Sequence, residues 1–132
     1  MSSAVEIIDL PKVEDERGNL TFVENNQIPF DIKRVYWIYD VPGGQERGGH
    51  AFEEQREVIV SLSGSFDVVI NDGSDENRFH LNRSYYGLYV PNLLWRHMEN
   101  FSTNAVVLVV SSTLYSADDY IRDFDHFQGL VS

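Results

Sequence analysis

The chain has 132 residues, 42% of them hydrophobic and 23% charged, a profile that suits one globular domain over residues 1–132. It contains no cysteine, which excludes a disulfide framework, a thiolate zinc site and a thiol nucleophile. Ten Lys and Arg against 21 Asp and Glu give a net charge of -11, which argues against nucleic acid and anionic membranes as partners. Any phosphorylated ligand must therefore be held by a few local arginines.

The first residues, 1–6, carry neither a basic segment nor an apolar one, so we expect no export signal. The longest apolar run, residues 105–110, has the length of a strand rather than of a membrane span. We therefore expect a cytoplasmic protein without a transmembrane segment.

Short β-branched and aromatic runs alternate with turn signals along most of the chain. The turn signals are the segments 17–19, 42–44 and 71–73, and the Asp-Gly pair in the last of these predicts a hairpin. Strands that recur roughly every 8–12 residues predict an all-β sandwich or barrel. The expected strands are residues 5–8, 20–24, 33–40, 57–62, 66–70, 77–81, 86–90, 93–96 and 105–111.

Only the C-terminal tail shows a helical period. Ser116 is placed to cap a short helix with Asp118 and Asp119 in its first turn. The acidic side chains of this tail are expected on a solvated face. One apolar stripe is expected to pack against the barrel or a partner subunit, and it consists of Tyr120, Ile121, Phe124 and Phe127.

Residues 49–64 resemble the first cupin motif, in which His-x-His is followed by a Glu and a Gly. His50, Glu57 and Gly64 stand at motif positions, but the second histidine position holds Phe52. This resemblance implies that the barrel is a cupin, a double-stranded β-helix of jelly-roll type, here with a short C-terminal helix.

Residues 87–97 resemble the second cupin motif, whose proline precedes a histidine. That histidine position holds Arg96, and His97 follows one step later, on the opposite face of the strand. A cupin metal is bound by the two histidines and the Glu of the first motif and the histidine of the second. Because Phe52 and Arg96 replace two of these four ligands, we expect no metal.

Several segments together, in order and spacing, are similar to the sugar-nucleotide 3,4-ketoisomerase family, the FdtA/WxcM-like cupins. The likeness extends from about residue 15 to residue 127. The segments are residues 15–20, 28–30, 34–40, 47–51, 87–95 and 119–127.

The resemblance implies a metal-free, cofactor-free homodimer that binds a dTDP-linked keto-deoxysugar at the mouth of the barrel. It implies an isomerase that interconverts the 4-keto and 3-keto forms of a dTDP-6-deoxyhexose through an enediol, in deoxysugar biosynthesis for surface glycans. His50 corresponds to the catalytic base, and Tyr36 is a candidate hydrogen-bond donor to a sugar oxygen. Arg17, Arg47 and Arg96 are candidates for substrate binding, since guanidinium groups bind phosphate in a bidentate manner.

The chain departs from the family pattern at four positions. Phe52 replaces the second histidine, Glu53 replaces a lysine, Glu57 replaces a glutamine and Arg96 replaces a histidine. Glu57 has two alternative uses: a replacement catalytic base with a raised pKa, or a partner for Arg96 that stays ionised. The departures also leave an alternative function open, a sugar-nucleotide-binding cupin without turnover.

Overall fold

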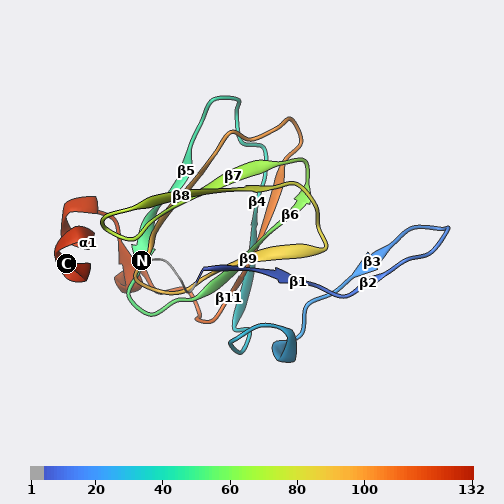
Figure 1. The fold of residues 1–132 in the computed structure, drawn as a ribbon, viewed down its shortest axis with the longest axis horizontal. Helices are drawn as coiled ribbons and strands as arrows, with labels where there is room; N and C mark the ends of the chain where they lie inside the picture. The colour runs from blue at the N-terminus through green and yellow to red at the C-terminus, as the bar shows by residue number, and fades with distance from the viewer. Residues whose placement is uncertain (1–4) are drawn as a thin grey trace.

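The computed structural model describes residues 5–132; residues 1–4, part of the segment without an export-like pattern, lie outside the described residues. Two five-stranded sheets face each other, with strand orders β1-β9-β6-β11-β4 and β12-β5-β10-β7-β8 (Figure 1). All of their pairings are antiparallel. This arrangement confirms the predicted all-β, cupin-type fold.

The strands are short, as the spacing of the turn signals predicts. Their bounds are β1 Glu6–Asp9, β2 Lys12–Val13, β3 Leu20–Thr21, β4 Arg34–Ile38, β5 Arg47–Phe52, β6 Glu57–Ser63, β7 Phe66–Asn71, β8 Glu76–Leu81, β9 Tyr86–Val90, β10 Trp95–Glu99, β11 Val106–Ser111 and β12 Tyr120–Ile121. The three helices are the single 3-10 turns η1 Asn25–Gln27 and η2 Ala117–Asp119 and the α-helix α1 Phe124–Val131.

The core lies between the two sheets and is made of alternate residues from both. Ile59, Leu88 and Val109 come from the first sheet, and Ile70 and Met98 from the second. All five side chains are fully buried or nearly so. This period-2 alternation fixes which side chain of each strand points into the barrel, and so decides which polar residues reach its interior.

The strand β5 was not among the strands expected from the sequence. Its segment begins Arg-Gly-Gly and has no β-branched residue, so it carries little strand propensity of its own. It forms because it pairs with β10 on one side and with β12 on the other. β10 also begins two residues later than expected, because Leu93 adopts a left-handed conformation, φ 60°, in the preceding turn.

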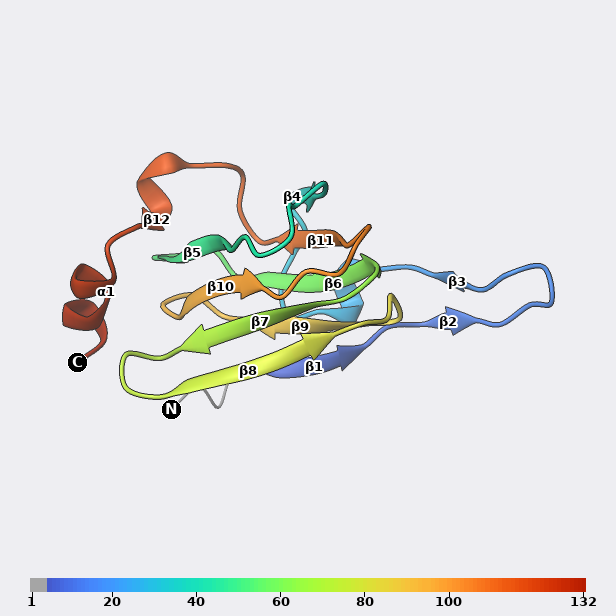
Figure 2. The ribbon, with the colours of Figure 1, turned by 90° about the horizontal axis from the view of Figure 1, so that it is seen from above.

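The two-stranded sheet of β2 and β3 projects from the barrel at the end opposite α1, as both views show (Figures 1 and 2). Its strands pair Lys12 with Thr21 and Val13 with Leu20. Val13 and Leu20 are each more than half exposed. A two-stranded hairpin of this kind has little stability alone.

The C-terminal tail corrects one expectation. Only the single 3-10 turn η2 follows Ser116, whose side chain makes no capping hydrogen bond, and the α-helix begins at Phe124, where the side chain of Asp123 accepts a hydrogen bond from the backbone of Asp125. Residues 120–121 instead extend the second sheet as β12, paired with β5. Phe127 is buried, and Phe124 packs with it against Trp95. Packing of the tail on the barrel is therefore confirmed, although the helix is shorter than predicted.

No helix within residues 5–132 is long and apolar enough to cross a membrane.

Candidate active site

A cavity of ≈ 500 Å³ opens beside strands β4, β5 and β10 and the segment that links β11 to α1. Its lining is rich in arginine and aromatic side chains, whereas the overall charge of the chain is strongly negative. The lining residues are Arg34, Tyr36, Trp37, Ile38, Arg47, Gly48, Gly49, His50, Arg96, Tyr115, Tyr120 and Arg122.

Arg96, which lines this cavity, forms a buried ion pair with Glu57, which lies behind the lining. Nε of Arg96 donates to Oε2 of Glu57 at 2.6 Å and Nη2 donates to Oε1 at 3.1 Å, and the two side chains are 2% and 1% exposed. Burial opposes the charge on Arg96, but its attraction to Glu57 and Tyr36 outweighs burial and raises the pKa of the guanidinium. Arg96 is therefore charged at any working pH.

Tyr36 joins this pair from β4. Its hydroxyl donates to Oε1 of Glu57 at 3.2 Å and accepts from Nη2 of Arg96 at 3.3 Å. Burial and the negative charge of Glu57 raise the pKa of Tyr36 above its ordinary value. Tyr36 is thus a protonated hydroxyl in the cavity wall, and its single O–H donates to a ligand oxygen only after it turns away from Glu57.

One glycine makes room for Arg96. Gly48 has a left-handed conformation, φ 74°, and its carbonyl accepts from Nη1 of Arg96 at 2.8 Å. A Cβ atom on Gly48 would lie within 2.3 Å of that nitrogen. Any other residue at this position would therefore displace the guanidinium or the strand.

His50 faces Arg96 across the β5–β10 pair and is 9% exposed. Its Nε2 atom is buried and has no hydrogen-bond partner among the described residues. Burial and then the positive charges of Arg96, Arg122 and Arg47 lower the pKa of His50 from 6.5 to about 2. The imidazole is therefore neutral, which is the form that can accept a proton.

An aromatic wall encloses the imidazole. The ring centroids of Phe52 and Tyr120 each lie 4.8 Å from that of His50 and 4.7 Å from each other. Phe52, at the position of the second motif histidine, also lies under the guanidinium of Arg96, 5.5 Å from its ring centroid. The aromatic wall stands where the motif has a second imidazole and contributes to the burial of His50.

Three further arginines give the cavity its positive charge. Within residues 5–132, no carboxylate lies within ion-pair distance of Arg34, Arg47 or Arg122, whereas the charge of Arg96 is offset by Glu57. The guanidinium of Arg122 lies over the ring of Tyr120 at 4.4 Å. Unpaired guanidinium groups around one cavity suit a ligand that carries phosphates.

The structure brings Tyr36, His50, Arg47 and Arg96 together in this cavity. Glu57 lies behind them and does not line it; its two oxygens are taken up by Arg96, Tyr36 and Gln55. This geometry matches the ion-pair use of Glu57 rather than its use as a base.

Arg17 is not brought to this cavity. It lies in the loop between β2 and β3, where its side chain, 89% exposed, pairs with Asp15 at 2.6 Å.

Sequence reasoning in turn missed Arg34, Tyr120 and Arg122 as lining residues. The last two stand in the family-like segment 119–127, but the predicted helix assigned that segment to packing alone.

The positions that bind metal in other cupins do not form a metal site here. Phe52 has no donor atom, and Arg96 places a cation where a ligand would stand. A different group of donors, Glu46, His97 and Glu99, lies together on the outer face of the second sheet. Nε2 of His97 lies 2.7 Å from Oε1 of Glu99.

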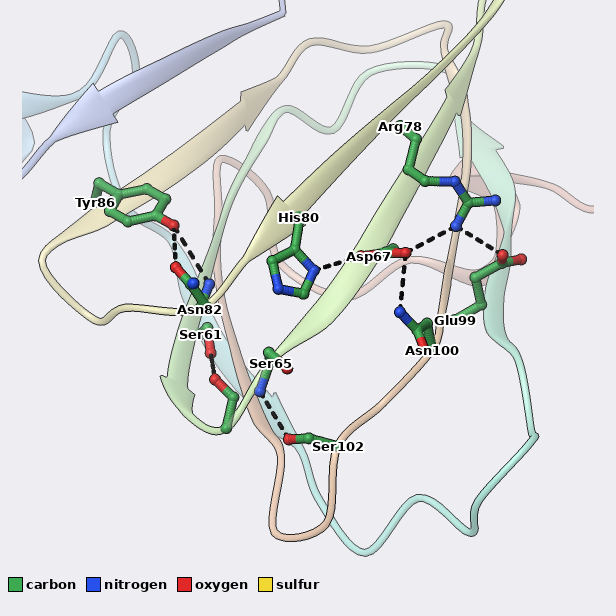
Figure 3. A network of polar contacts seen from close by, with 11 residues as sticks. Ser61, Ser65, Asp67, Arg78, His80, Asn82, Tyr86, Glu99, Asn100 and Ser102 are labelled. Atoms are coloured by element: carbon green, nitrogen blue, oxygen red, sulfur yellow. Dashed lines mark hydrogen bonds and ion pairs between the residues drawn. The ribbon is translucent and has the colours of Figure 1, made fainter.

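The outer-face group belongs to a surface network of hydrogen bonds and ion pairs. Arg78 bridges Glu99 at 2.8 Å and Asp67 at 2.9 Å, and Asp67 in turn contacts His80 and Asn100 (Figure 3). Glu99 is thus already neutralised by a protein cation. His97 takes part in this network and points away from the cavity, as the strand alternation predicts.

Comparisons with known proteins agree on one family. A family model described as FdtA: WxcM-like, C-terminal, matches residues 3–132. A curated TDP-4-oxo-6-deoxy-alpha-D-glucose-3,4-oxoisomerase from Aneurinibacillus thermoaerophilus is 39% identical over 127 residues, which cover 96% of this chain and 91% of the relative.

Solved structures show the same similarity. The TDP-quinovose 3,4-ketoisomerase WlaRB from Campylobacter jejuni is 42% identical, with a TM-score of 0.90 over 95% of this chain and 97% of that one. The sugar 3,4-ketoisomerase QdtA from Thermoanaerobacterium thermosaccharolyticum, in complex with TDP, is 36% identical, with a TM-score of 0.96 over 99% and 96%. A His-to-Asn mutant of QdtA was solved with TDP-4-keto-6-deoxyglucose.

Proposed function

The chain belongs to the WxcM-like, C-terminal (FdtA) family, and we propose that it is a sugar-nucleotide 3,4-ketoisomerase acting on a dTDP-linked 4-keto-6-deoxyhexose. The observation that carries this proposal is the buried, neutral His50, whose Nε2 atom has no hydrogen-bond partner within residues 5–132, in a cavity that three arginines without a carboxylate partner in that range help to line. A proton-transfer reaction on an anionic substrate needs both features.

The first step of the proposed reaction moves the proton from C3 of the sugar to His50. The C3–H bond is weakly acidic because it stands next to the C4 ketone, and the electron pair it leaves forms the C3=C4 double bond of an enediolate. His50 is neutral in the free protein, and the negative charge of a bound diphosphate beside the arginines raises its low pKa and so its basicity toward this proton. For the carbonyl group to move to C3, the hydroxyl proton on the C3 oxygen passes to the negative oxygen on C4, and the imidazolium then returns its proton to C4, which leaves a ketone at C3, a hydroxyl at C4 and a neutral His50.

The reaction also requires a hydrogen-bond donor to the sugar oxygen that becomes negative in the enediolate. Tyr36 and Arg96 are both in the cavity lining, and both are protonated. Hydrogen bonds from fixed donors to a developing oxyanion are among the largest contributions to enzymatic rate. We assign Tyr36 as the donor to the sugar oxygen and Arg96 as the charge beside it, held in place by Glu57.

The diphosphate is assigned to the arginines without carboxylate partners. Arg47 and Arg122 contribute to the low pKa of His50, and Arg34 lines the same cavity. A bound diphosphate would offset the positive charges of these arginines inside the cavity. Arg96, in contrast, is committed to Glu57 and contacts the sugar rather than the phosphates.

The direct test is to incubate the protein with dTDP-4-keto-6-deoxyglucose in deuterated water and follow the sugar by NMR. We expect conversion to the 3-keto isomer, with deuterium entering the sugar ring where the transferred proton exchanges with solvent. TDP binding without any conversion or exchange would instead identify a sugar-nucleotide-binding protein, the alternative function. No conversion and no TDP binding would contradict both functions.

We propose further that the enzyme is a homodimer. The outer face of the first sheet exposes Val35 and Leu62, which are 45% and 48% exposed. A cavity of ≈ 540 Å³ separates this face from the projecting hairpin, and Val35, Leu62 and Phe22 help to line it. A second copy of this chain would cover these apolar side chains. Arg17 would then contact substrate only in the cavity of the partner subunit, since it lies away from the cavity of its own chain.

Light scattering during gel filtration tests the dimer. We expect twice the 15.2 kDa mass of one chain, and a Leu62→Glu variant that elutes as a monomer. Leu130→Glu, at a similarly exposed leucine of α1, is the matched control and should remain a dimer. A monomeric wild-type protein would overturn the proposal.

We also propose a cytoplasmic location, which cell fractionation would test.

A further inference from the structure

The side chain of Gln55 connects two parts of the candidate active site. It is 2% exposed and lies in the turn before β6. Its Oε1 atom accepts from Nη2 of Arg34 at 2.7 Å, and its Nε2 atom donates to Oε1 of Glu57 at 3.2 Å. One buried amide thus contacts a guanidinium of the cavity wall on one side and the Arg96–Glu57 pair on the other.

The orientation of this amide is fixed by its other contacts. Arg34 can only donate and the carboxylate of Glu57 can only accept, which identifies the amide atom beside Arg34 as the oxygen, and the hydroxyl of Thr113 donates to the same Oε1 atom at 3.0 Å. The backbone N–H of Gln55 donates to the carboxylate of Asp119 at 3.0 Å, and that carboxylate also accepts from the backbone of Glu54 at 2.8 Å. Backbone and side chain are therefore both held, and rotation of the amide would lose three hydrogen bonds at once.

The orientation of the Arg34 guanidinium depends on its hydrogen bond to Gln55. Its Nε atom is buried without a hydrogen-bond partner among the described residues, and no carboxylate of residues 5–132 pairs with it. Its guanidinium lies between the rings of Tyr36 and Tyr115, 5.0 and 5.6 Å from their centroids. The side-chain oxygen of Gln55 is the acceptor that orients it, and its Nε–H remains unused.

We propose that Gln55 is a positioning residue, which holds Arg34 ready for the substrate diphosphate and at the same time holds Glu57 ready to fix Arg96 and Tyr36. This inference rests on the proposed function of the cavity. An amide is the side chain that can do both, since it offers an acceptor to the cation and a donor to the carboxylate. A carboxylate at this position would stand beside that of Glu57, and an apolar side chain would leave Arg34 without its acceptor and remove one of the donors to Glu57.

The test is a double-mutant cycle read out by TDP affinity and by turnover. Gln55→Met should raise the Kd for TDP, measured by calorimetry, by about tenfold, because a hydrogen bond that orients a charged group is lost. In an Arg34→Met background the same change should leave the Kd unaltered, because Gln55 acts on TDP through Arg34. kcat should fall in both backgrounds, because the contact with Glu57 is lost in both.

Gln55→Glu separates the two contacts. It keeps an acceptor for Arg34 and Thr113 but places a second carboxylate beside that of Glu57, so kcat should fall more than in Gln55→Met, whereas the Kd for TDP should rise less. It is also of native size and serves as the second variant if Gln55→Met does not fold. Gln128→Met, at an exposed glutamine of α1, is the matched control and should leave Kd, kcat and KM unchanged.

A purely structural role would lower the thermal stability but leave the Kd for TDP unchanged in the folded protein, and this result would overturn the proposal. Additive losses of TDP affinity in the double mutant would overturn it as well. The binding measurement does not depend on turnover, so wild-type protein that binds TDP without converting the sugar would contradict only the isomerase function. Wild-type protein that binds no TDP would contradict both.

Discussion

Arg96 and Glu57 meet inside the barrel, with 2.6 Å between Nε of the arginine and Oε2 of the glutamate. Either residue without the other would be an uncompensated buried charge. Together they form a neutral unit that presents a guanidinium to the cavity. The two residues are therefore one structural unit.

The first prediction concerns this pair. Glu57→Gln should lower the free energy of unfolding by about 3 kcal/mol, because it leaves the charge of Arg96 buried without a counter-charge. The double variant Glu57→Gln/Arg96→Gln should recover much of that loss, since no charge is then buried. Urea unfolding of the single and double variants measures both values.

The Arg17–Asp15 pair supplies the control for that experiment. Its arginine is fully exposed, so Arg17→Gln should leave the urea midpoint unchanged. Equal losses in Glu57→Gln and in the double variant would contradict the ion-pair interpretation.

The second prediction concerns the base. His50→Asn should lower kcat by at least about a hundredfold, because general-base catalysis contributes factors of this size. TDP affinity should change little, because the diphosphate is assigned to arginines. His97→Asn, on the adjacent strand but on the outer face, is the control and should keep the wild-type rate. Steady-state kinetics and calorimetry measure these quantities, and a His50→Asn enzyme of normal rate would exclude His50 as the base.

The third prediction concerns how the substrate changes that base. Arg122 and Arg47 help to lower the pKa of His50 to about 2 in the free protein, although burial contributes more. A bound diphosphate adds negative charge beside these arginines, so it favours the imidazolium and should raise the pKa of His50. NMR titration of the His50 ring with and without TDP measures the shift. An unchanged or lower pKa in the complex would show that the diphosphate binds elsewhere.

The fourth prediction concerns acid stability. The unfolded chain binds a proton at His50 below about pH 6.5, whereas the folded chain does not until about pH 2, so acid favours unfolding in this window. The free energy of unfolding should therefore fall by up to about 1.4 kcal/mol per pH unit more steeply in the wild type than in His50→Asn. Urea unfolding between pH 7 and pH 4 compares the two slopes. Parallel slopes would mean that His50 titrates alike in both states.

The fifth prediction concerns Gly48. Gly48→Ala should destabilise the protein by about 2 kcal/mol, because alanine disfavours a positive φ and its Cβ atom would meet Arg96. It should also lower kcat, because Arg96 is displaced. Gly43→Ala is the control: nothing lies within 4 Å of a Cβ atom there, and no positive φ is required. Thermal unfolding and kinetics compare the two variants, and equal behaviour would show that Arg96 adapts without cost.

The sequence by itself determined the strand-rich architecture, most of the strands and the family. Alternating apolar residues and Gly-, Asn- and Asp-rich turns act over a few neighbouring residues, so they can be seen in the chain itself. The same local alternation predicted that Arg96 and His97 lie on opposite faces of β10. The motif positions of His50 and Tyr36 likewise placed both residues near one cavity.

Only the tertiary structure decided which charged and polar side chains contact one another. Glu57 and Arg96 are 39 residues apart in sequence, and whether they pair depends on the packing of β6 against β10 across the barrel. The same holds for Gln55, whose partners Arg34 and Thr113 come from distant segments, and for β5, which exists through its pairing partners. Arg17 has the residue type suited to phosphate, but its place on the projecting hairpin keeps it from its own cavity. Side-chain chemistry can be read locally, whereas a site depends on contacts between distant segments, which form only when the sheets close into a barrel.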